Sequence, residues 1–281
     1  AWKPVTVFLN GKYWGHMNLR ERVDRFFIAQ FEGLPLDQAD EMDILEANGT
    51  VNFGSNKAYR AMLKKIKAGS PATNPDDLQY ILDNVDVDNL FEYMALEMFV
   101  GNSDIGNIRY YRLHQEGSKW KWIWYDADYG LYSSKFNSPW SYLKVKGMGE
   151  QKIDNTIFLK LLEHPDYKRK FLEKLADVYK TFTTEYMTQV LDGVLAEIQP
   201  EMKNHWERWG ELNDKAVTSE VPTTIDGAYT YWESRVNRLY NTLKVRPHRL
   251  WDFIKDEFKL TKTEMEELFG PQPDYPDDAV L

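Results

Sequence analysis

Four oxygen-bearing side chains occupy two neighbouring segments of the sequence. Asp104 and Asn107 lie in the segment GNSDIGNIRYYR, and Asp126 and Asp128 lie in the segment WKWIWYDADYG. Carboxylate and amide oxygens without nearby His or Cys are the ligands of hard cations such as Mg²⁺, Mn²⁺ or Ca²⁺ rather than of zinc. The chain contains no Cys, and its five His residues show no metal-ligand spacing. The pattern therefore indicates an oxygen-rich cation site.

These two segments flank a predicted β-hairpin. Residues 108–113 and 120–125 are rich in β-branched and aromatic residues, and the stretch HQEGSK between them is typical of a hairpin loop. A hairpin returns the chain beside its start, so Asp104 and Asn107 are expected close to Asp126 and Asp128, with all four side chains converging at one edge. Asp and Asn at the ends of helices and strands are also common cap and turn residues, which leaves a purely structural interpretation open for each.

The spacing of the two acidic segments is compatible with phosphoryl transfer. That reaction uses an Asp and an Asn to hold Mg²⁺ and a second Asp to accept a hydroxyl proton. Asp126 follows Asp104 by 22 residues, and in protein kinases the catalytic loop and a metal-binding Asp likewise lie on either side of a hairpin. The stretch YDADYG could equally be a calcium loop, but it does not follow the EF-hand pattern. The sequence contains neither a P-loop nor a G-x-G-x-x-G motif.

The surrounding sequence predicts a mixture of strands and helices. The stretch VTVFL, the dipeptide Asn10-Gly11 and the stretch KYWGHMNLRE predict an antiparallel hairpin with a type I′ turn. A short helix is expected with Asp24 in its first turn, and an apolar helix is expected to end near Gly101. The other expected elements are a strand over residues 42–48, helices over 56–67 and to about residue 82, and long helices from Thr156 onward.

Length and composition allow a substantial core. The chain has 281 residues, of which 43% are hydrophobic, enough for one large domain or two unequal lobes. We expect a single domain over residues 1–268, with an N-terminal lobe to about residue 85, a predominantly helical C-terminal lobe from 86, and a Pro/Asp-rich tail or linker over 269–281. Because the sequence starts without Met and almost at once enters a strand pattern, it is expected to be a mature or trimmed fragment.

The net charge excludes some classes of partner. Thirty-five Lys and Arg against forty-four Asp and Glu give a formal charge of −9, which would repel nucleic acid. An acidic surface suits a basic peptide substrate or divalent cations instead. No apolar run approaches the roughly 18 residues of a membrane span, and the lack of Cys excludes disulfides and thiol nucleophiles while leaving the compartment open.

Four segments together resemble the CotH kinase-like family, named for the spore coat protein H of spore-forming bacteria. In chain order they are VTVFLNGKYWGHMNLRERVD, FGSNKAYRAML, GNSDIGNIRYYR and WKWIWYDADYG. The resemblance extends from about residue 5 to 258. It implies an α+β, atypical protein-kinase-like fold with a small hairpin-containing N-terminal lobe and a helical C-terminal lobe. It also implies transfer of the γ-phosphate of ATP to serine on a protein substrate, with Mg²⁺ or Mn²⁺ as cofactor and Ca²⁺ as a further possibility.

The resemblance also implies roles for individual residues. Asp104 would be the catalytic base, and Asp126 would be the metal-binding counterpart of the aspartate that follows the hairpin in kinases. Asn107 and Asp128 would help at the metal or orient Asp126. Glu21 would be the acidic residue that orients a nucleotide-contacting Lys or supports a metal.

A kinase also needs a cation on the nucleotide phosphates. The family places basic and Gly-containing nucleotide-binding elements ahead of the Asn-Gly hairpin, and this sequence begins at Ala1, so other basic residues are expected to substitute. Arg20 and Arg109 are the favoured candidates. The further candidates are Lys12, Arg22 and Lys57.

A different class of function is also compatible with the sequence. The chain could be a non-catalytic structural or binding module that has the same kinase-like fold and is stabilised by calcium. The resemblance places either version outside the cell or on the spore surface. The Trp side chains of WKWIW alternate and would lie on one face of a strand, where they could stack on a sugar or an adenine ring. Packing in the core or between the lobes is the favoured interpretation.

Overall fold

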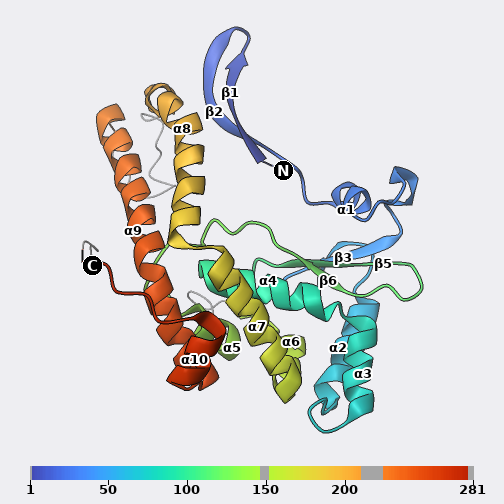
Figure 1. Cartoon of the computed structure of the whole chain (residues 1–281). Helices are drawn as coiled ribbons and strands as arrows, with labels where there is room; N and C mark the ends of the chain where they lie inside the picture. The colour runs from blue at the N-terminus through green and yellow to red at the C-terminus, as the bar shows by residue number, and fades with distance from the viewer. Residues whose placement is uncertain (1, 146–151, 210–223, 278–281) are drawn as a thin grey trace. The chain divides into compact units, whose positions relative to one another are not determined.

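The computed structural model describes residues 2–145, 152–209 and 224–277 (Figure 1). The chain forms two compact units. The first contains the described residues of Ala1–Arg22 and Thr183–Lys244, and the second contains those of Val23–Phe182 and Val245–Asp277. The division of the chain into kinase-like lobes near residue 85 stays a prediction.

The first unit begins with the predicted hairpin, which the structure confirms. Strands β1 (Trp2–Leu9) and β2 (Lys12–Arg20) pair antiparallel. Asn10 and Gly11 form the turn with φ angles of 51° and 76°, the positive values that a type I′ turn requires. The turn sets the pairing of Leu9 with Lys12 and of Phe8 with Tyr13, and an irregularity between Val7 and Phe8 shifts the register of the remaining pairs by one residue.

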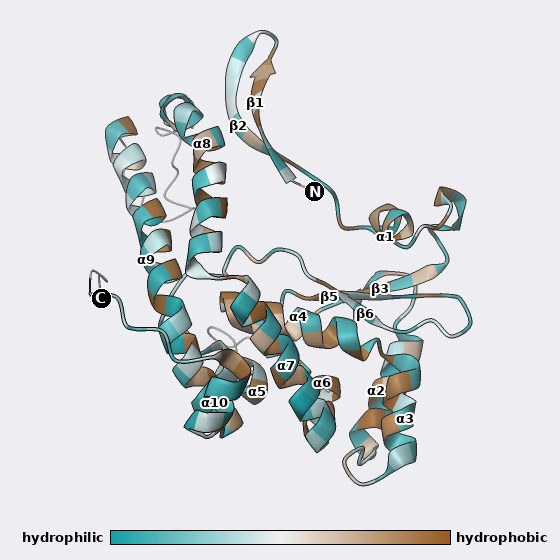
Figure 2. Cartoon of the chain, viewed as in Figure 1, coloured by the Kyte–Doolittle hydropathy of each residue, from teal (hydrophilic) through white to brown (hydrophobic). Residues whose placement is uncertain are grey.

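Helix α8 (Thr184–Trp209) packs against the hairpin. The indole nitrogen of Trp209 donates to the carbonyl oxygen of Trp14 over 2.6 Å, and the amide of His16 donates to Nδ1 of His205 over 3.2 Å. Helix α9 (Ile225–Phe258) begins in this unit and continues into the second. Figure 2 shows both hydrophobic and hydrophilic residues along α8 and α9, as expected for amphipathic helices.

The second unit contains a four-stranded antiparallel sheet in the order β4-β3-β5-β6. Strand β3 (Met42–Glu46) and the hairpin of β5 (Arg109–Leu113) and β6 (Lys121–Ile123) confirm the sequence prediction. Strand β4 (Thr50–Phe53) was not predicted. It has four residues, of which three are exposed, so it lacks the apolar alternation by which a strand is recognised.

Helices surround this sheet, and the mixed α+β class is confirmed. No helix in the described ranges is long and apolar enough to cross a membrane. Asp24 is the N-cap of the first helix rather than part of its first turn, because its carboxylate accepts from the amides of Phe26 and Phe27. The elements are α1 (Arg25–Phe31), a 3₁₀ turn (Leu36–Gln38), α2 (Lys57–Ala68), α3 (Pro75–Asn84), α4 (Val87–Val100), α5 (Ser138–Lys144), α6 (Thr156–Leu162), α7 (Pro165–Thr181) and α10 (Lys262–Phe269).

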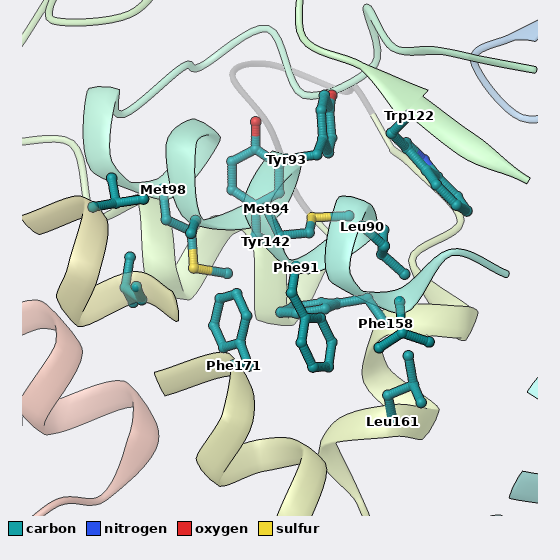
Figure 3. Packing of buried hydrophobic residues seen from close by; sticks show 14 of the residues in the cluster. Leu90, Phe91, Tyr93, Met94, Met98, Trp122, Tyr142, Phe158, Leu161 and Phe171 are labelled. Atoms are coloured by element: carbon teal, nitrogen blue, oxygen red, sulfur yellow. The ribbon is translucent and has the colours of Figure 1, made fainter. Parts of the chain in front are cut away.

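Helix α4 is the central element of the core, as its apolar pattern predicted. Phe91, Phe158 and Phe171 form a cluster with ring centroids 4.8–6.1 Å apart (Figure 3). Ring pairs at such distances favour edge-to-face packing, and all three pairs have this geometry. Trp120 and Trp122 belong to the same core, with 0% and 6% of their surfaces exposed. The packing interpretation of WKWIW is therefore confirmed for these two tryptophans, whereas Trp124, the third on the predicted face, is 45% exposed.

The C-terminal end of α4 is closed by Gly101 and Arg246. Gly101 has a φ of 66°, and the Arg246 guanidinium lies so close that an added Cβ would come within 2.5 Å of its Nη2. Arg246 is 2% exposed and donates to the carbonyl oxygens of Met98 and Phe99. Glycine is therefore required here both for the backbone angle and for space.

We expect Gly101→Ala to destabilise the protein more than Gly117→Ala. Both glycines have positive φ, 66° and 73°, but nothing lies within 4 Å of a Cβ added at Gly117. The backbone strain of about 1–2 kcal/mol should be common to both variants, and the collision with Arg246 should add roughly 1–3 kcal/mol at Gly101. Urea unfolding of the two variants measures the difference, and equal losses would show that Arg246 does not restrict this position.

Candidate active site

The segment after α4 holds Asp104 between buried anchors. Asn102 and Ser103 are 1% and 4% exposed, and Ile105 and Ile108 are 0% and 5% exposed. Asp104 itself is only partly buried. The chain is thus fixed on both sides of this aspartate while its side chain remains accessible.

The backbone of Asp104 is positioned through Asn102. The Oδ1 atom of Asn102 accepts a hydrogen bond from the Asp104 amide at 3.1 Å. The same side chain also hydrogen-bonds Glu97, which is 1% exposed and accepts a 2.7 Å hydrogen bond from the Tyr142 hydroxyl. Figure 3 shows the hydroxyl groups of Tyr93 and Tyr142 directed away from the phenylalanine cluster. A buried polar network therefore links α4 to the Asp104 backbone.

The carboxyl group of Glu97 has an unusual environment. Burial raises its pKa, and the nearby Asp104 raises it further, while hydrogen bonds from Tyr142, Asn102 and Trp124 partly oppose the rise. The raised pKa favours the protonated form of Glu97. A neutral Glu97 reduces the repulsion that a second negative charge would exert on Asp104.

Asp126 comes directly after the hairpin and meets Asn107. The Asn107 amide nitrogen donates to Oδ2 of Asp126 at 2.6 Å, and the Tyr125 hydroxyl donates to Oδ1 of Asn107 at 2.8 Å. Asp126 has a φ of 54°, which is uncommon for a residue other than glycine and is concentrated at functional sites. The hairpin thus brings the two acidic segments together, as its geometry predicted.

Tyr125 is a central residue of this site that the sequence reasoning did not single out. Burial raises the pKa of its hydroxyl, Arg109 lowers it, and Glu46, Asp126 and Asp104 raise it. The ring of Tyr125 therefore lies among all of these charges. Its position next to Asp126, on the strand face opposite the buried tryptophans, was the signal available in the sequence.

Arg109 is engaged within the second unit. Its guanidinium lies 4.8 Å from the centroid of the Tyr125 ring, pairs with Glu46 at 3.2 Å and donates to the carbonyl oxygen of Val23 at 2.5 Å. The Arg109 side chain is only 17% exposed. In this conformation Arg109 supports Tyr125, and a contact to nucleotide phosphate stays a prediction.

The remaining predicted residues lie outside this network. Asp128 is exposed in the turn after Asp126 and, within the described part of the chain, makes no hydrogen bond or ion pair. Arg20 is the last residue of β2 and Glu21 follows it; both are exposed and belong to the first unit. Their roles at a nucleotide stay predictions.

The carboxylate oxygens of Asp126 and the amide oxygen of Asn107 fit a cation that is bound jointly by the protein and by the phosphate groups of a substrate. Mg²⁺ is usually held by one or two carboxylates together with substrate phosphates and water. A half-turn of the Asn107 amide would exchange its nitrogen and oxygen and present an oxygen beside Asp126, with the Tyr125 hydroxyl then accepting. Among the residues that the structure describes, no group of three or more His, Cys, Asp or Glu could hold a metal ion.

The structure confirms the predicted order of an acidic segment, an antiparallel hairpin and a second acidic segment. The family model for CotH kinase protein matches residues 1–250. The chain therefore belongs to the CotH kinase family, as its motifs predicted. A search of curated proteins found no match.

We expect Asn102→Ala to lower the free energy of unfolding by about 1–3 kcal/mol, because it removes the hydrogen bond to the Asp104 amide and one of the hydrogen bonds to the buried Glu97 carboxyl group. Asn18→Ala is the control: Asn18 is exposed and accepts from the Trp2 indole at 2.9 Å, and its loss should change the free energy of unfolding by less than about 0.5 kcal/mol. Similar effects in chemical unfolding would contradict the positioning role of Asn102.

Glu97→Gln should flatten the dependence of stability on pH. The folded protein retains a proton on Glu97 that the unfolded chain releases above the ordinary value of 4.5. The stabilisation from this group is therefore present below that pH and is lost as pH rises through the folded pKa. The free energy of unfolding of wild type minus that of Glu97→Gln should fall over this range, and a constant difference would contradict the raised pKa. Asp104→Asn should shift the fall to lower pH.

Proposed function

We propose that this chain is a CotH-type protein kinase that transfers the γ-phosphate of ATP to a serine hydroxyl of a protein substrate. The observation that best supports the proposal is the 2.6 Å hydrogen bond between Asn107 and Asp126, because it joins the segment of Asp104 to the segment after the hairpin. Membership of a kinase family supports the use of ATP and a divalent cation in general.

In the proposed reaction, a bond forms between the serine oxygen and the γ-phosphorus. The bond from that phosphorus to the β–γ bridging oxygen breaks, and ADP leaves. Asp104 would accept the hydroxyl proton and orient the attacking oxygen. Asp126 and Asn107 would hold Mg²⁺ or Mn²⁺, which when bound neutralises charge on the phosphates. Calcium is the less favoured occupant.

The surrounding residues would keep these groups in place. Asn102 restrains the backbone of Asp104, and Tyr125 restrains Asn107 through a 2.8 Å hydrogen bond. Such restraint matters because a catalytic group displaced by a fraction of an ångström loses much of its effect. We propose phosphate contacts for Arg20 and Arg109 and an accessory role at the metal for Asp128. Glu21 is proposed as the acid that orients a nucleotide-contacting Lys or supports a metal.

The substrate is proposed to be a serine-containing segment rich in Lys and Arg. The formal charge of −9 favours encounter with a basic partner. We also propose kinase-like lobes over about residues 1–85 and 86–268, a tail over 269–281, and a location outside the cell or on the spore surface. These last proposals depend on the family resemblance.

The assigned roles predict different defects for two conservative variants. Asp126→Asn should lose the Mg²⁺- or Mn²⁺-dependent rise in melting temperature with ATP, because the charged ligand is gone. Asp104→Asn should keep that rise but reduce phosphate transfer to a basic serine peptide by at least roughly 100-fold, the scale of a lost general base. Thermal-shift titration and a radiolabelled transfer assay measure the two effects.

Asp37→Asn is a suitable control because Asp37 is exposed in the 3₁₀ turn after α1. This variant should match wild type in both assays. Transfer that persists in Asp104→Asn would refute its role as base. Calcium-selective stabilisation without any response to ATP would favour the non-catalytic module instead.

A further inference from the structure

A cavity of about 430 Å³ lies within the second unit, between α1, α4 and β6. This aromatic groove is defined by its apolar lining of Phe27, Phe31, Tyr93, Leu96 and Trp124. Its volume falls within the range of roughly 300–1,000 Å³ that is common for ligand sites. Neither the proposed phosphoryl transfer nor the cation ligands use it.

Two aromatic side chains of the groove are unusually exposed. Phe31 is 73% exposed and Trp124 is 45% exposed. Exposed aromatic residues around a concave surface mark interaction sites more often than isolated exposed residues do. The groove therefore has the apolar character of a surface that a partner covers.

Pairing with a further β-strand cannot explain this surface. Strand β6 is the edge of the sheet, but the Asn89 side chain already bonds its backbone. The amide of Trp122 donates to Asn89 Oδ1 at 2.6 Å, and Asn89 Nδ2 donates to the Trp122 carbonyl oxygen at 3.1 Å. The amide of Trp120 donates to the carbonyl oxygen of Asn84 at 2.8 Å. A partner in the groove therefore cannot extend the sheet at Trp120 and Trp122 and has to contact the side chains that line the groove.

The polar part of the groove is acidic. Asp86 and Glu92 line it. The only basic residue in its lining, Lys121, already pairs with Glu32 at 2.8 Å. Burial raises the pKa of Glu32, but hydrogen bonds from Lys121 and Tyr111 outweigh that effect and lower it overall, so Glu32 stays charged and keeps Lys121 engaged. Glu92 is exposed and can pair with a cationic partner. Asp86 is the N-cap of α4, where its Oδ1 accepts from the Asn89 amide at 3.1 Å, and its second carboxylate oxygen can accept from the same partner.

A second hollow extends this acidic region. It has a volume of about 320 Å³ and shares Asp86, Tyr111 and Lys121 with the aromatic groove. Its further lining includes Glu116 and Lys119. The two hollows are thus neighbours that share lining residues, with aromatic residues in the first and the carboxylates of Glu32, Asp86 and Glu116 in the second.

The aromatic end lies beside the candidate active site. Trp124 directly precedes Tyr125, the residue that holds Asn107. Tyr93 lines the groove and interacts electrostatically with both Tyr125 and Asp104. A segment bound in the groove would therefore place its neighbouring residues close to the proposed base.

We propose that the aromatic groove binds a short segment of the phosphoacceptor protein in which a large aromatic or aliphatic side chain lies near Arg or Lys. The apolar side chain packs between Phe31 and Trp124, and the basic residues pair with Asp86 and Glu92. The identity of the partner as the phosphoacceptor rests on the proposed function. The chemistry of the bound segment rests on the groove alone.

The test uses fluorescence anisotropy of the full chain with short fluorescein-labelled peptides that contain Arg pairs at several distances from one Phe. Matched peptides have Ser in place of Phe or Glu in place of Arg. The Arg/Phe peptides should bind, and both replacements should weaken binding by roughly tenfold or more. Absence of binding by every Arg/Phe peptide, or equal binding of the matched peptides, would overturn the proposal.

Two surface variants test the location. Phe31→Ala and Glu92→Arg should each weaken binding by roughly tenfold while leaving the ATP-dependent thermal shift unchanged. Phe8→Ala and Glu267→Arg are matched controls, since Phe8 is 61% exposed in the first unit and Glu267 is exposed on α10. Unchanged peptide binding in the groove variants would overturn the proposal.

The same experiment separates this proposal from the kinase proposal. Displacement of the peptide by ATP, with loss of the ATP response in Phe31→Ala, would make the groove a nucleotide site and overturn peptide docking. Peptide binding that depends on Phe31 and Glu92 in a chain that shows no ATP response would support the groove and reject the kinase assignment.

Discussion

Arg246 donates hydrogen bonds to the carbonyl oxygens of Met98 and Phe99 in the last turn of α4 and to the hydroxyl of Ser138. These carbonyl groups have no partner within the helix, so a buried cation is well placed to satisfy them. Burial lowers the pKa of Arg246 to about 10, which still leaves it charged at neutral pH. The guanidinium also packs on Gly101. This contact fixes the direction in which the chain leaves α4.

Both acidic segments depend on this helix end. Gly101 starts the segment that leads to Asp104, and the amide of Leu131, after Asp126, donates to the carbonyl oxygen of Val100 at 2.6 Å. Gly130 allows that approach, since a Cβ there would lie 3.0 Å from a Val100 methyl group. The relation between the two aspartates is thus set by α4 as well as by the hairpin.

Neutral donors, rather than cations, satisfy the key carboxylates. Asp126 accepts from the amide of Asn107, and Glu97 accepts from the hydroxyl of Tyr142. Since Asn107 is neutral, its hydrogen bond does not cancel the charge of the Asp126 carboxylate, whereas the raised pKa of Glu97 favours its protonated form. Asp86 and Glu92 of the aromatic groove add further negative charge. Cation binding and substrate docking, as proposed, would therefore use the same negative electrostatic potential.

Local sequence patterns determined many, though not all, of the elements of this protein: strand β4 and helix α5 were not predicted. Asn10-Gly11 specifies its hairpin turn because few residues adopt positive φ, and the apolar pattern before Gly101 specifies α4. The hairpin between Asp104 and Asp126 follows from β-rich runs around a polar loop, and it implied that their segments meet. Such features depend on neighbours along the chain, and they can be read without coordinates.

Tertiary structure decided which distant groups complete the site. Arg246 lies 147 residues from Phe99, and no local pattern states which carbonyl oxygen a buried guanidinium reaches. Tyr125 and Glu97 resemble an ordinary strand residue and an ordinary helix residue in the sequence, yet packing places one against Asn107 and buries the other beside Asp104. Burial and long-range hydrogen bonding depend on the folded chain as a whole, whereas turns and amphipathic helices depend on short stretches of it.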